Sequence, residues 1–422
     1  ALPILKALGL QRRGRMIELK STRFITTISA ISAALLILAG CSSSSESASS
    51  TASTTTAKSA VPDIPMASAV GASEGQLNII AWAGYAENGS TDKNYDWVTP
   101  FEKASGCKVN VKIGNTSDEM VTLMKTGEYD GVSASGDATL RLIYGGDVAP
   151  VNTDLVPNYA TVSDFLKNQQ WNSVDGKMYG IPHGWGANVL ASVDGKVSPA
   201  PTSWGAVFDP NSPYKGKVSA YDSPIYIADA ALYLSKTKPE LGIKNPYALD
   251  DKQFAAAVDL LKTQKGIVGE YWSDYTKAVQ SLESGNTLLT TSWQVIVNMV
   301  NGGKKAKVSA SVPSEGATGW SDTWMISSKA KHPNCMYKWM DHIISPSANA
   351  AVAEYFGEAP AQTKACDVTS DKNFCATYHA TDAAYAANIH YWTTPTKECL
   401  DGRGAICKDY AAWTQAWTEI KG

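Results

Sequence analysis

The residues best suited to chemistry in this chain are its tryptophans, because the faces of their rings attract cations. The sequence holds 13 tryptophans and 19 tyrosines against 7 phenylalanines, and several stand where a short apolar run ends. A cation over such a ring gains about 0.5–2 kcal/mol, depending on its desolvation. With acidic residues nearby, the rings predict a cleft for a small organic cation, although any one of them could equally be core or hinge packing. These rings are Trp82, Tyr85, Trp185, Trp293, Trp320 and Trp324.

The phosphate-loop and zinc motifs of other chemistries are missing from the sequence. It has no G-x-x-x-x-G-K-[ST] or G-x-G-x-x-G loop for phosphate and no H-E-x-x-H zinc motif. Residues 131–136 miss the G-x-S-x-G nucleophile elbow, because Ser135 stands where the second glycine is needed. The five histidines are scattered, and we expect them on the surface or in loops. We therefore predict a binding protein, not an enzyme, with no cofactor and no metal; an envelope hydrolase is a remote alternative.

The charge distribution argues against nucleic acid as a partner. The formal net charge is -3, but residues 1–41 carry six basic groups and one acidic group. The chain beyond Cys41 therefore holds 31 basic and 39 acidic residues. Proteins that bind nucleic acid need a basic surface, so we expect no such partner, whereas an acidic body suits a cationic ligand.

The N-terminal residues have the composition of an export signal. Residues 1–15 precede the only plausible start, Met16, and we interpret them as an upstream extension. Residues 16–41 combine a basic start with an apolar run that ends in Leu38-Ala39-Gly40-Cys41. This order is typical of a secretory signal, and its end resembles a bacterial lipobox, in which Cys41 is lipidated and becomes the mature N-terminus. An ordinary signal or an uncleaved anchor helix is the alternative.

The segment that follows Cys41 predicts a tether. Residues 42–75 are mostly Ser, Thr and Ala, a composition that cannot bury enough surface to offset the entropy of ordering the chain. No later stretch reaches the roughly 18 apolar residues of a spanning helix. We therefore expect an extracytoplasmic body that is held at the membrane by the lipid on Cys41.

The other cysteines predict structural disulfides. Six remain after Cys41, and an even number in an exported chain is typical of disulfide bonding, although sequence cannot choose among the 15 pairings. The last four would form two close pairs that staple C-terminal loops, and the first two would then join distant segments. A metal site is the alternative, but there is no C-x-x-C motif. The candidates are Cys107, Cys335, Cys366, Cys375, Cys399 and Cys407.

The elements that must position these side chains alternate between strand and helix. Residues 77–82 and 108–112 have strand patterns, and residues 95–106 and 116–124 have helical spacing, the latter with a capping-box start. With a further strand before residues 133–136, this order predicts an α/β lobe with a mainly parallel sheet. A second such unit starts near Gly186, and the length of 422 residues suits two lobes. Ligands of open α/β sheets lie beyond the carboxyl ends of the strands.

Five short segments carry a resemblance to a known family. They are AWAGY at 81–85, YDGVSAS at 129–135, YGIPHGWG at 179–186, TSW at 202–204 with YKG at 214–216, and GATGWSD at 316–322. In this order they resemble the polyamine-binding group of extracellular solute-binding proteins, the spermidine/putrescine receptors of ATP-driven importers. The resemblance covers most of residues 77–422. It implies an α/β, periplasmic-binding-protein-like (type II) clamshell with a ligand cleft between two lobes.

By position, the resemblance implies ligand-binding residues from both lobes. Asp322 is the leading carboxylate for an ammonium group, Asp222 is the second, and Trp293 is a cation–π wall. Glu358 stands where an aromatic residue is usual and could replace lost charge. The whole set is Trp82, Tyr85, Ser135, Asp222, Trp293, Trp320, Asp322 and Glu358.

Some acids of the family pattern are missing. Ser223, Tyr226 and Ile296 stand where relatives offer further acids. Because an unpaired buried ammonium group is costly, these departures weaken the assignment of spermidine more than that of the fold. A shorter diamine such as putrescine, or another organic cation, stays open.

We therefore predict a substrate-binding lipoprotein of an ABC importer that captures putrescine or spermidine and delivers it to a membrane permease. We expect it to be monomeric. The first lobe is assigned to residues 76–184 and 316–390 and the second to 185–315, while the lobe of the helical segment 391–422 is left open. The same receptor fold for another organic cation, an amino-acid derivative or a sugar is the alternative.

Overall fold

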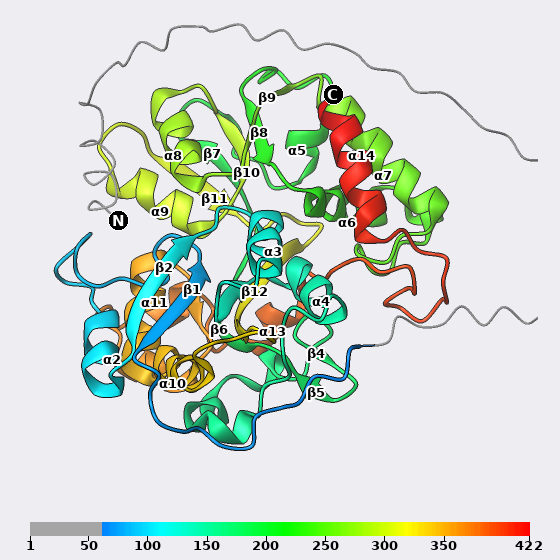
Figure 1. Cartoon of the computed structure of the whole chain (residues 1–422). Helices are drawn as coiled ribbons and strands as arrows, with labels where there is room; N and C mark the ends of the chain where they lie inside the picture. The colour runs from blue at the N-terminus through cyan, green and yellow to red at the C-terminus, as the bar shows by residue number, and fades with distance from the viewer. Residues whose placement is uncertain (1–60) are drawn as a thin grey trace, which may run out of the picture.

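Residues 61–422 form two α/β lobes in the computed structural model, each built around its own sheet (Figure 1). This confirms the predicted two-lobed α/β architecture. The predicted upstream extension, the signal segment and Cys41 lie outside the residues that the structure describes. Among residues 61–422, no helix is both long and apolar enough to cross a bilayer.

The first lobe contains a seven-stranded sheet in the order β13-β6-β12-β3-β1-β2, with β14 beside β12. β1 is parallel to β2 and β3, whereas β12 is antiparallel to β3 and β6. Its strands are β1 (Gln76–Ala81), β2 (Lys108–Ile113), β3 (Gly131–Ala134), β6 (Ile181–Ala187), β12 (Ala317–Ile326), β13 (Ala359–Pro360) and β14 (Ile389–Tyr391). Its helices are α2 (Val98–Ser105), α3 (Ser117–Lys125), α4 (Gly136–Tyr144), α10 (Pro333–Ile343), α11 (Pro346–Phe356), α12 (Phe374–Thr377) and α13 (Ala383–Ala387). A separate two-stranded ribbon is formed by β4 (Ser173–Val174) and β5 (Lys177–Met178).

The second lobe contains a five-stranded sheet in the order β11-β7-β10-β8-β9. β8 is parallel to β9 and β10, and β7 is antiparallel to β10 and β11. Its strands are β7 (Val189–Val193), β8 (Val218–Tyr221), β9 (Val268–Trp272), β10 (Leu289–Ser292) and β11 (Val308–Ser311). Its helices are α5 (Gly205–Phe208), α6 (Ile227–Thr237), α7 (Asp251–Gln264), α8 (Tyr275–Ser284), α9 (Gln294–Gly302) and α14 (Tyr410–Lys421).

Local sequence signals explain the first helices of the fold. The predicted strands at 77–82 and 108–112 are β1 and β2, and the predicted helices are α2 and α3. The backbone N–H of Glu119 donates to Thr116 Oγ1 at 3.1 Å, as the capping-box sequence predicts. The Glu119 carboxylate accepts from the N–H of Asn115 instead of from Thr116, so only half of the box forms.

The chain passes between the lobes at three places. It leaves the first sheet after Ala187 and enters the second at Val189, three residues beyond the predicted boundary at 184/185, because β6 continues to Ala187. It returns between β11 and β12, where the boundary at 315/316 was expected. After β14 it crosses again, and α14 packs against α7 of the second lobe. The segment 391–422, left open by the sequence, therefore starts on the first lobe and ends on the second (Figure 1).

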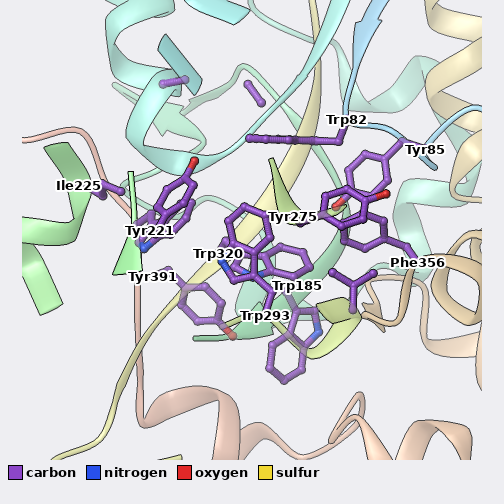
Figure 2. Packing of buried hydrophobic residues seen from close by; sticks show 14 of the residues in the cluster. Trp82, Tyr85, Trp185, Tyr221, Ile225, Tyr275, Trp293, Trp320, Phe356 and Tyr391 are labelled. Carbon is purple, nitrogen blue, oxygen red and sulfur yellow. The ribbon is translucent and has the colours of Figure 1, made fainter. Parts of the chain in front are cut away.

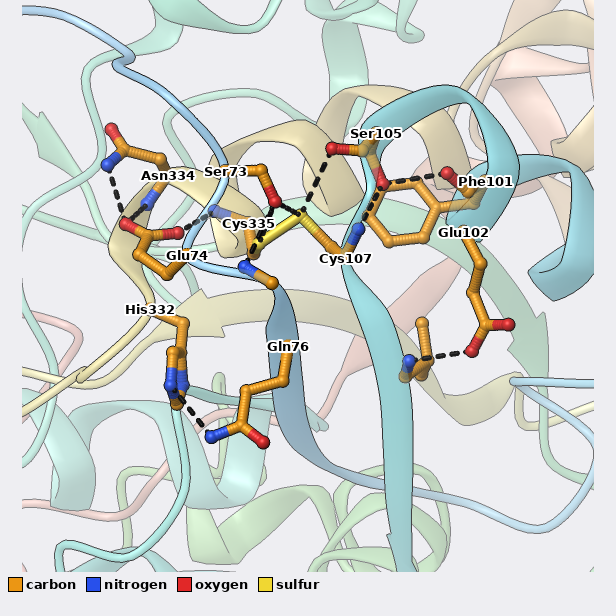
Figure 3. Close-up of a disulfide and its surroundings, with 12 residues drawn as sticks. Ser73, Glu74, Gln76, Phe101, Glu102, Ser105, Cys107, His332, Asn334 and Cys335 are labelled. Carbon is orange, nitrogen blue, oxygen red and sulfur yellow. Dashed lines mark hydrogen bonds between the residues drawn. A yellow bond between two sulfur atoms is a disulfide. The ribbon is translucent and has the colours of Figure 1, made fainter.

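Three disulfides form, and they are the pairs that the sequence favoured. Cys107 bonds Cys335, Cys366 bonds Cys375, and Cys399 bonds Cys407. The first links the start of β2 to α10 across 228 residues of chain (Figure 3). Because a cross-link restricts the unfolded chain more when the closed loop is longer, we expect this disulfide to contribute most to stability.

The described part of the predicted tether does not hang free. Val61, Ala67 and Val70 are partly buried against the core of the first lobe. The Glu74 carboxylate accepts the backbone N–H groups of Asn334 and Cys335, both at 2.9 Å, at the start of α10 (Figure 3). Residues 61–75 thus differ from the flexible tether predicted for 42–75. Although the average composition of the segment resembles a linker, the contacts of its few apolar residues and of Glu74 hold residues 61–75 against the first lobe.

Candidate functional site

Aromatic residues that follow the strand ends meet between the two sheets (Figure 2). Trp82 follows β1 of the first lobe and Trp293 follows β10 of the second, and their ring centroids are 6.2 Å apart, edge to face. Beside them lies a small cavity of about 10 Å³. It is lined by Trp82, Tyr85, Ser135, Trp293, Trp320, Asp322, Phe356 and Trp392, which include six of the eight predicted residues.

A tight turn after β1 directs Tyr85 toward this cavity. Gly84 has a φ of +93°, a conformation that side-chain-bearing residues rarely adopt. A Cβ atom at Gly84 would also lie only 3.3 Å from the ring of Tyr355. The Trp97 indole N–H donates to the Tyr85 carbonyl at 3.2 Å and holds the turn in place. The segment AWAGY therefore needs its glycine to place the Tyr85 hydroxyl in the site.

Asp322 is the acid that lines this cavity. It lies on β12 and is 3% exposed, beside a register irregularity between Asp322 and Thr323 in the pairing with β6. Such bulges commonly re-aim side chains next to functional sites. Ser135, the N-cap residue of α4, donates its hydroxyl to Asp322 Oδ1, and the Tyr85 hydroxyl lies 2.7 Å from Oδ2.

A second acid, Glu358, lies behind Tyr85. Its Oε2 is 2.9 Å from the Tyr85 hydroxyl, which also contacts Asp322. A phenol has one proton to donate, so the two carboxyl groups compete for it unless one of them is itself protonated. Burial and the nearby charge of Glu358 raise the pKa of Asp322 to about 6, although hydrogen bonds from Ser135 and Tyr85 oppose this rise. Within the part of the chain described here, neither acid has a lysine or arginine partner.

Glycines on β6 make room for this pair of acids. In the antiparallel pairing of β6 with β12, Gly184 stands opposite Asp322 and Gly186 opposite Trp320. A Cβ atom at Gly184 would overlap the carboxyl group of Glu358, and one at Gly186 would lie 2.9 Å from the Trp320 ring. The absence of side chains at Gly184 and Gly186 thus leaves room for Glu358 and Trp320 to pack against β6.

His183 lies on the same strand and corrects the expectation that the histidines occupy the surface or loops. It is fully buried on β6, which lies between β13 and β12 in the first-lobe sheet. Its Nδ1 is 3.5 Å from Glu358 Oε1, and its Nε2 is 3.3 Å from Ser133 Oγ. This Ser133–His183–Glu358 series has the order of a hydrolytic triad, but Ser133 and His183 are both 0% exposed. The series therefore offers no open nucleophile.

Asp222, the second predicted carboxylate, lies elsewhere. It follows β8, and its oxygens accept from Lys421 Nζ at 2.7 Å and from the Trp417 indole N–H at 2.9 Å. Both partners belong to α14, which packs against α7 and the short turn Pro224–Tyr226. The charge of Asp222 is thus balanced by the protein's own C-terminal helix, and Asp222 does not line the cavity of Asp322.

Two residues that line the cavity of Asp322 were not predicted from the sequence. Phe356 is the last residue of α11, and Trp392 follows β14. Trp392 donates its backbone N–H to the Gly319 carbonyl at 2.7 Å, because β14 pairs with β12. An aromatic residue just after a short strand was the signal that identified Trp82 and Trp293, and Tyr391-Trp392 repeats it. The signal was missed because the strand, Ile389–Tyr391, is only three residues long.

Comparison with protein families finds a match over more than half of the chain. The model of the bacterial extracellular solute-binding proteins matches residues 96–388. Among curated relatives, the putrescine/agmatine-binding protein of Pseudomonas aeruginosa is 26% identical over 62% of this chain and 75% of its own. The putrescine-binding periplasmic protein PotF of Escherichia coli is 26% identical over 72% of this chain and 84% of its own.

Solved structures share the fold. A Listeria monocytogenes protein named for spermidine/putrescine ABC transport superposes with a TM-score of 0.68 at 17% identity, covering 82% of this chain and 99% of its own. An Agrobacterium tumefaciens binding protein in complex with glucopine has a TM-score of 0.63 at 19% identity, with coverages of 82% and 100%. At such identities the likeness shows the two-lobed fold, and the ligands of these neighbours differ.

Proposed function

Because this chain belongs to the bacterial extracellular solute-binding proteins, the substrate-binding components of ABC importers, we propose that its solute is a polyamine such as putrescine or spermidine. The family places the protein outside the cytoplasm. Our proposal adds that a lipid on Cys41 anchors it, that it acts as a monomer, and that it passes the solute to a membrane permease without chemical change.

One observation carries the proposal of a cationic solute. Two buried acids, Asp322 and Glu358, face each other across the Tyr85 hydroxyl, and the structure pairs neither with lysine or arginine in residues 61–422. A buried carboxylate without a cation is costly. An ammonium group in the cavity would supply the missing charge, and the walls of Trp82, Trp293 and Trp320 would contact its alkyl chain and its charge.

The same geometry links binding to closure of the lobes. The first lobe contributes Asp322, Tyr85 and Trp82, and the second contributes Trp293, so a ligand contacts both sets only when the lobes are together. A ligand shifts an open–closed equilibrium only by its difference in affinity for the two forms. Contacts with Trp293 that exist only in the closed form would supply that difference, and the closed form would be the one that a permease recognises.

The direct test is a ligand screen on residues 61–422 by thermal shift, followed by titration calorimetry. The panel contains putrescine, cadaverine, spermidine, spermine, betaine, amino acids and sugars. A ligand at about 1,000 times its Kd should stabilise the protein by about 4 kcal/mol, and we expect this only with polyamines. A folded protein that responds to none of the amines would refute the polyamine proposal and leave the receptor fold.

A zwitterionic solute, such as an amino-acid derivative, is the second candidate. Trp82 and Trp320 line the cavity, and their indole N–H groups are buried and have no acceptor within the described protein. They could donate to a carboxylate while Asp322 accepts from an ammonium group of the same molecule. The amino acids in the panel test this: tighter binding of a zwitterion than of any diamine would favour it.

Catalysis is the remote alternative, because Ser133, His183 and Glu358 stand in triad order. Both contacts of His183 are longer than hydrogen bonds of good geometry, and Ser133 has no exposed surface. Hydrolysis of p-nitrophenyl esters that disappears in Ser133→Ala would establish an enzyme. We expect no turnover above that of the Ser133→Ala protein.

A further inference from the structure

A second cavity adjoins the first on the side of the second lobe. It is small, about 10 Å³, and shares two walls, Trp293 and Trp392, with the cavity of Asp322. Tyr221 stacks on Trp392 with ring centroids 5.7 Å apart, and Trp272 meets Trp293 edge to face at 4.9 Å. The lining is Asn188, Tyr221, Tyr226, Asp229, Trp272, Thr291, Ser292, Trp293 and Trp392.

One carboxylate stands in this lining, and the protein gives it only a neutral partner. Asp229 lies on α6 and is 3% exposed. Its Oδ1 accepts from Thr318 Oγ1 at 2.9 Å, and Thr318 Oγ1 in turn accepts from Asn188 Nδ2 at 2.6 Å. No lysine, arginine or histidine lines this cavity among residues 61–422, and burial raises the pKa of Asp229 to about 7.

Two further acceptors in the lining lack a partner. Asn188 Oδ1 and the Tyr221 hydroxyl are buried and have no hydrogen bond within the described chain. Each belongs to a residue that lines the cavity with Asp229. An ammonium group has three N–H donors, which the Asp229 carboxylate, Asn188 Oδ1 and Tyr221 oxygen could accept together. The acceptors of this cavity thus lack a positively charged hydrogen-bond donor.

We propose that the second cavity binds the second ammonium group of an α,ω-diamine, with Asp229 as its carboxylate, while Asp322 binds the first; this rests on the polyamine function proposed above. The alkyl chain between the ammonium groups passes along Trp293 and Trp392, the walls common to both cavities. Asp229 therefore supplies the negative charge in a cavity whose wall includes Tyr226, one of the positions where the family pattern has an acid.

The position of the second cavity gives this end of the ligand a role in closure. Asn188 is the residue between β6 and β7, where the chain first leaves the first lobe, and Thr318 lies near the start of β12, where it returns. Asp229 belongs to the second lobe, so its bond to Thr318 joins the lobes beside the crossings. A second ammonium group bound here would add its own contacts to that junction.

Calorimetry with matched amines tests the proposal. Putrescine carries two ammonium groups and butylamine carries one on the same four-carbon chain. We expect Asp229→Asn to weaken putrescine binding at least tenfold and to leave butylamine binding within twofold of wild type. The wild type should also show a preferred length in the series from propane-1,3-diamine to cadaverine, and the variant should lose it. Asp222→Asn, whose carboxylate is paired with Lys421 outside both cavities, is the matched control.

Tyr221→Phe gives a second, milder variant, since it removes only the hydroxyl and keeps the stacked ring. We expect a smaller loss, about threefold to tenfold, again confined to diamines. Unchanged putrescine affinity in a folded Asp229→Asn protein would overturn the inference while leaving the proposed function intact, and so would equal losses for putrescine and butylamine. If the wild type binds no diamine at all, the proposed function fails, and this inference fails with it.

Discussion

Replacing Asp322 with asparagine isolates the charge at the centre of the first cavity. Asparagine has nearly the same shape, and its Oδ1 can still accept from Ser135 or Tyr85, so the variant should fold. What it removes is the negative charge that an ammonium ligand would meet. The ligand-free variant should be at least as stable as wild type, because burial of that charge is unfavourable, as the raised pKa of Asp322 indicates.

The loss of affinity can be estimated from the contacts. Deleting one partner of a charge-assisted hydrogen bond costs about 1.5–3 kcal/mol, and leaving a buried ion wholly unpaired costs about 3–5 kcal/mol. Glu358 remains on the other side of Tyr85 and limits the damage. We therefore expect about 2–3 kcal/mol, which is about 30- to 150-fold in Kd for putrescine.

Titration calorimetry at pH 7.5 measures this difference, with Asp222→Asn as the control that should bind like wild type. The gap between wild type and Asp322→Asn should narrow toward pH 5, because the pKa of Asp322 is about 6 and its carboxyl loses charge below that value. A loss of less than threefold at pH 7.5 in a correctly folded variant would refute the assignment of Asp322. If the difference in affinity between the two proteins did not change with pH, the negative charge of Asp322 would not be what binds the ligand.

Three further predictions concern the frame of the site. Gly184→Ala should displace the Glu358 carboxyl and weaken putrescine binding at least tenfold, with a loss of about 1–3 kcal/mol in stability, measured by calorimetry and urea unfolding. Cys107→Ser with Cys335→Ser should lower the free energy of unfolding by about 4–5 kcal/mol, more than removal of either short-loop disulfide, because the loop spans 228 residues. Burial raises the pKa of Asp137 to about 7, above its unfolded value, so its contribution to the stability of the ligand-free protein is lost as pH rises through 7. The Tm should therefore increase as the pH falls from 8 to 5.5, and Asp137→Asn should flatten that increase. The same change of Tm with pH in both proteins would contradict this.

The sequence predicts the frame of this molecule well because the frame depends on local patterns. Apolar runs and helical spacing locate β1, β2, α2 and α3 within a few residues. Trp82 and Trp293 reach the cavity because each directly follows a strand that ends there. Such residues need no long-range information, since the end of the strand determines their position.

The missing parts of the site depend on pairings between distant segments. Glu358 meets His183 only because β13 pairs with β6, and nothing near either residue indicates that pairing. The family resemblance implied that Asp222 faces the cleft, and the sequence did not indicate that α14 would cover it. Asp229 gave no signal, because an acid within an apolar helix is recognisable as a ligand only when its surroundings are known.

The third crossing of the chain has a mechanical consequence. Two crossings, at Asn188 and between β11 and β12, allow the lobes to swing about a line through both. The third is fastened at each end: Thr394 donates to the Gly136 and Asp137 carbonyls of the first lobe, and Arg403 binds Asp250 at the start of α7 in the second. A connecting segment that is bonded to both lobes limits how far they can separate, so this protein should open through a smaller angle than one with only two crossings. The same segment should return the two lobes to the same relative position each time they close.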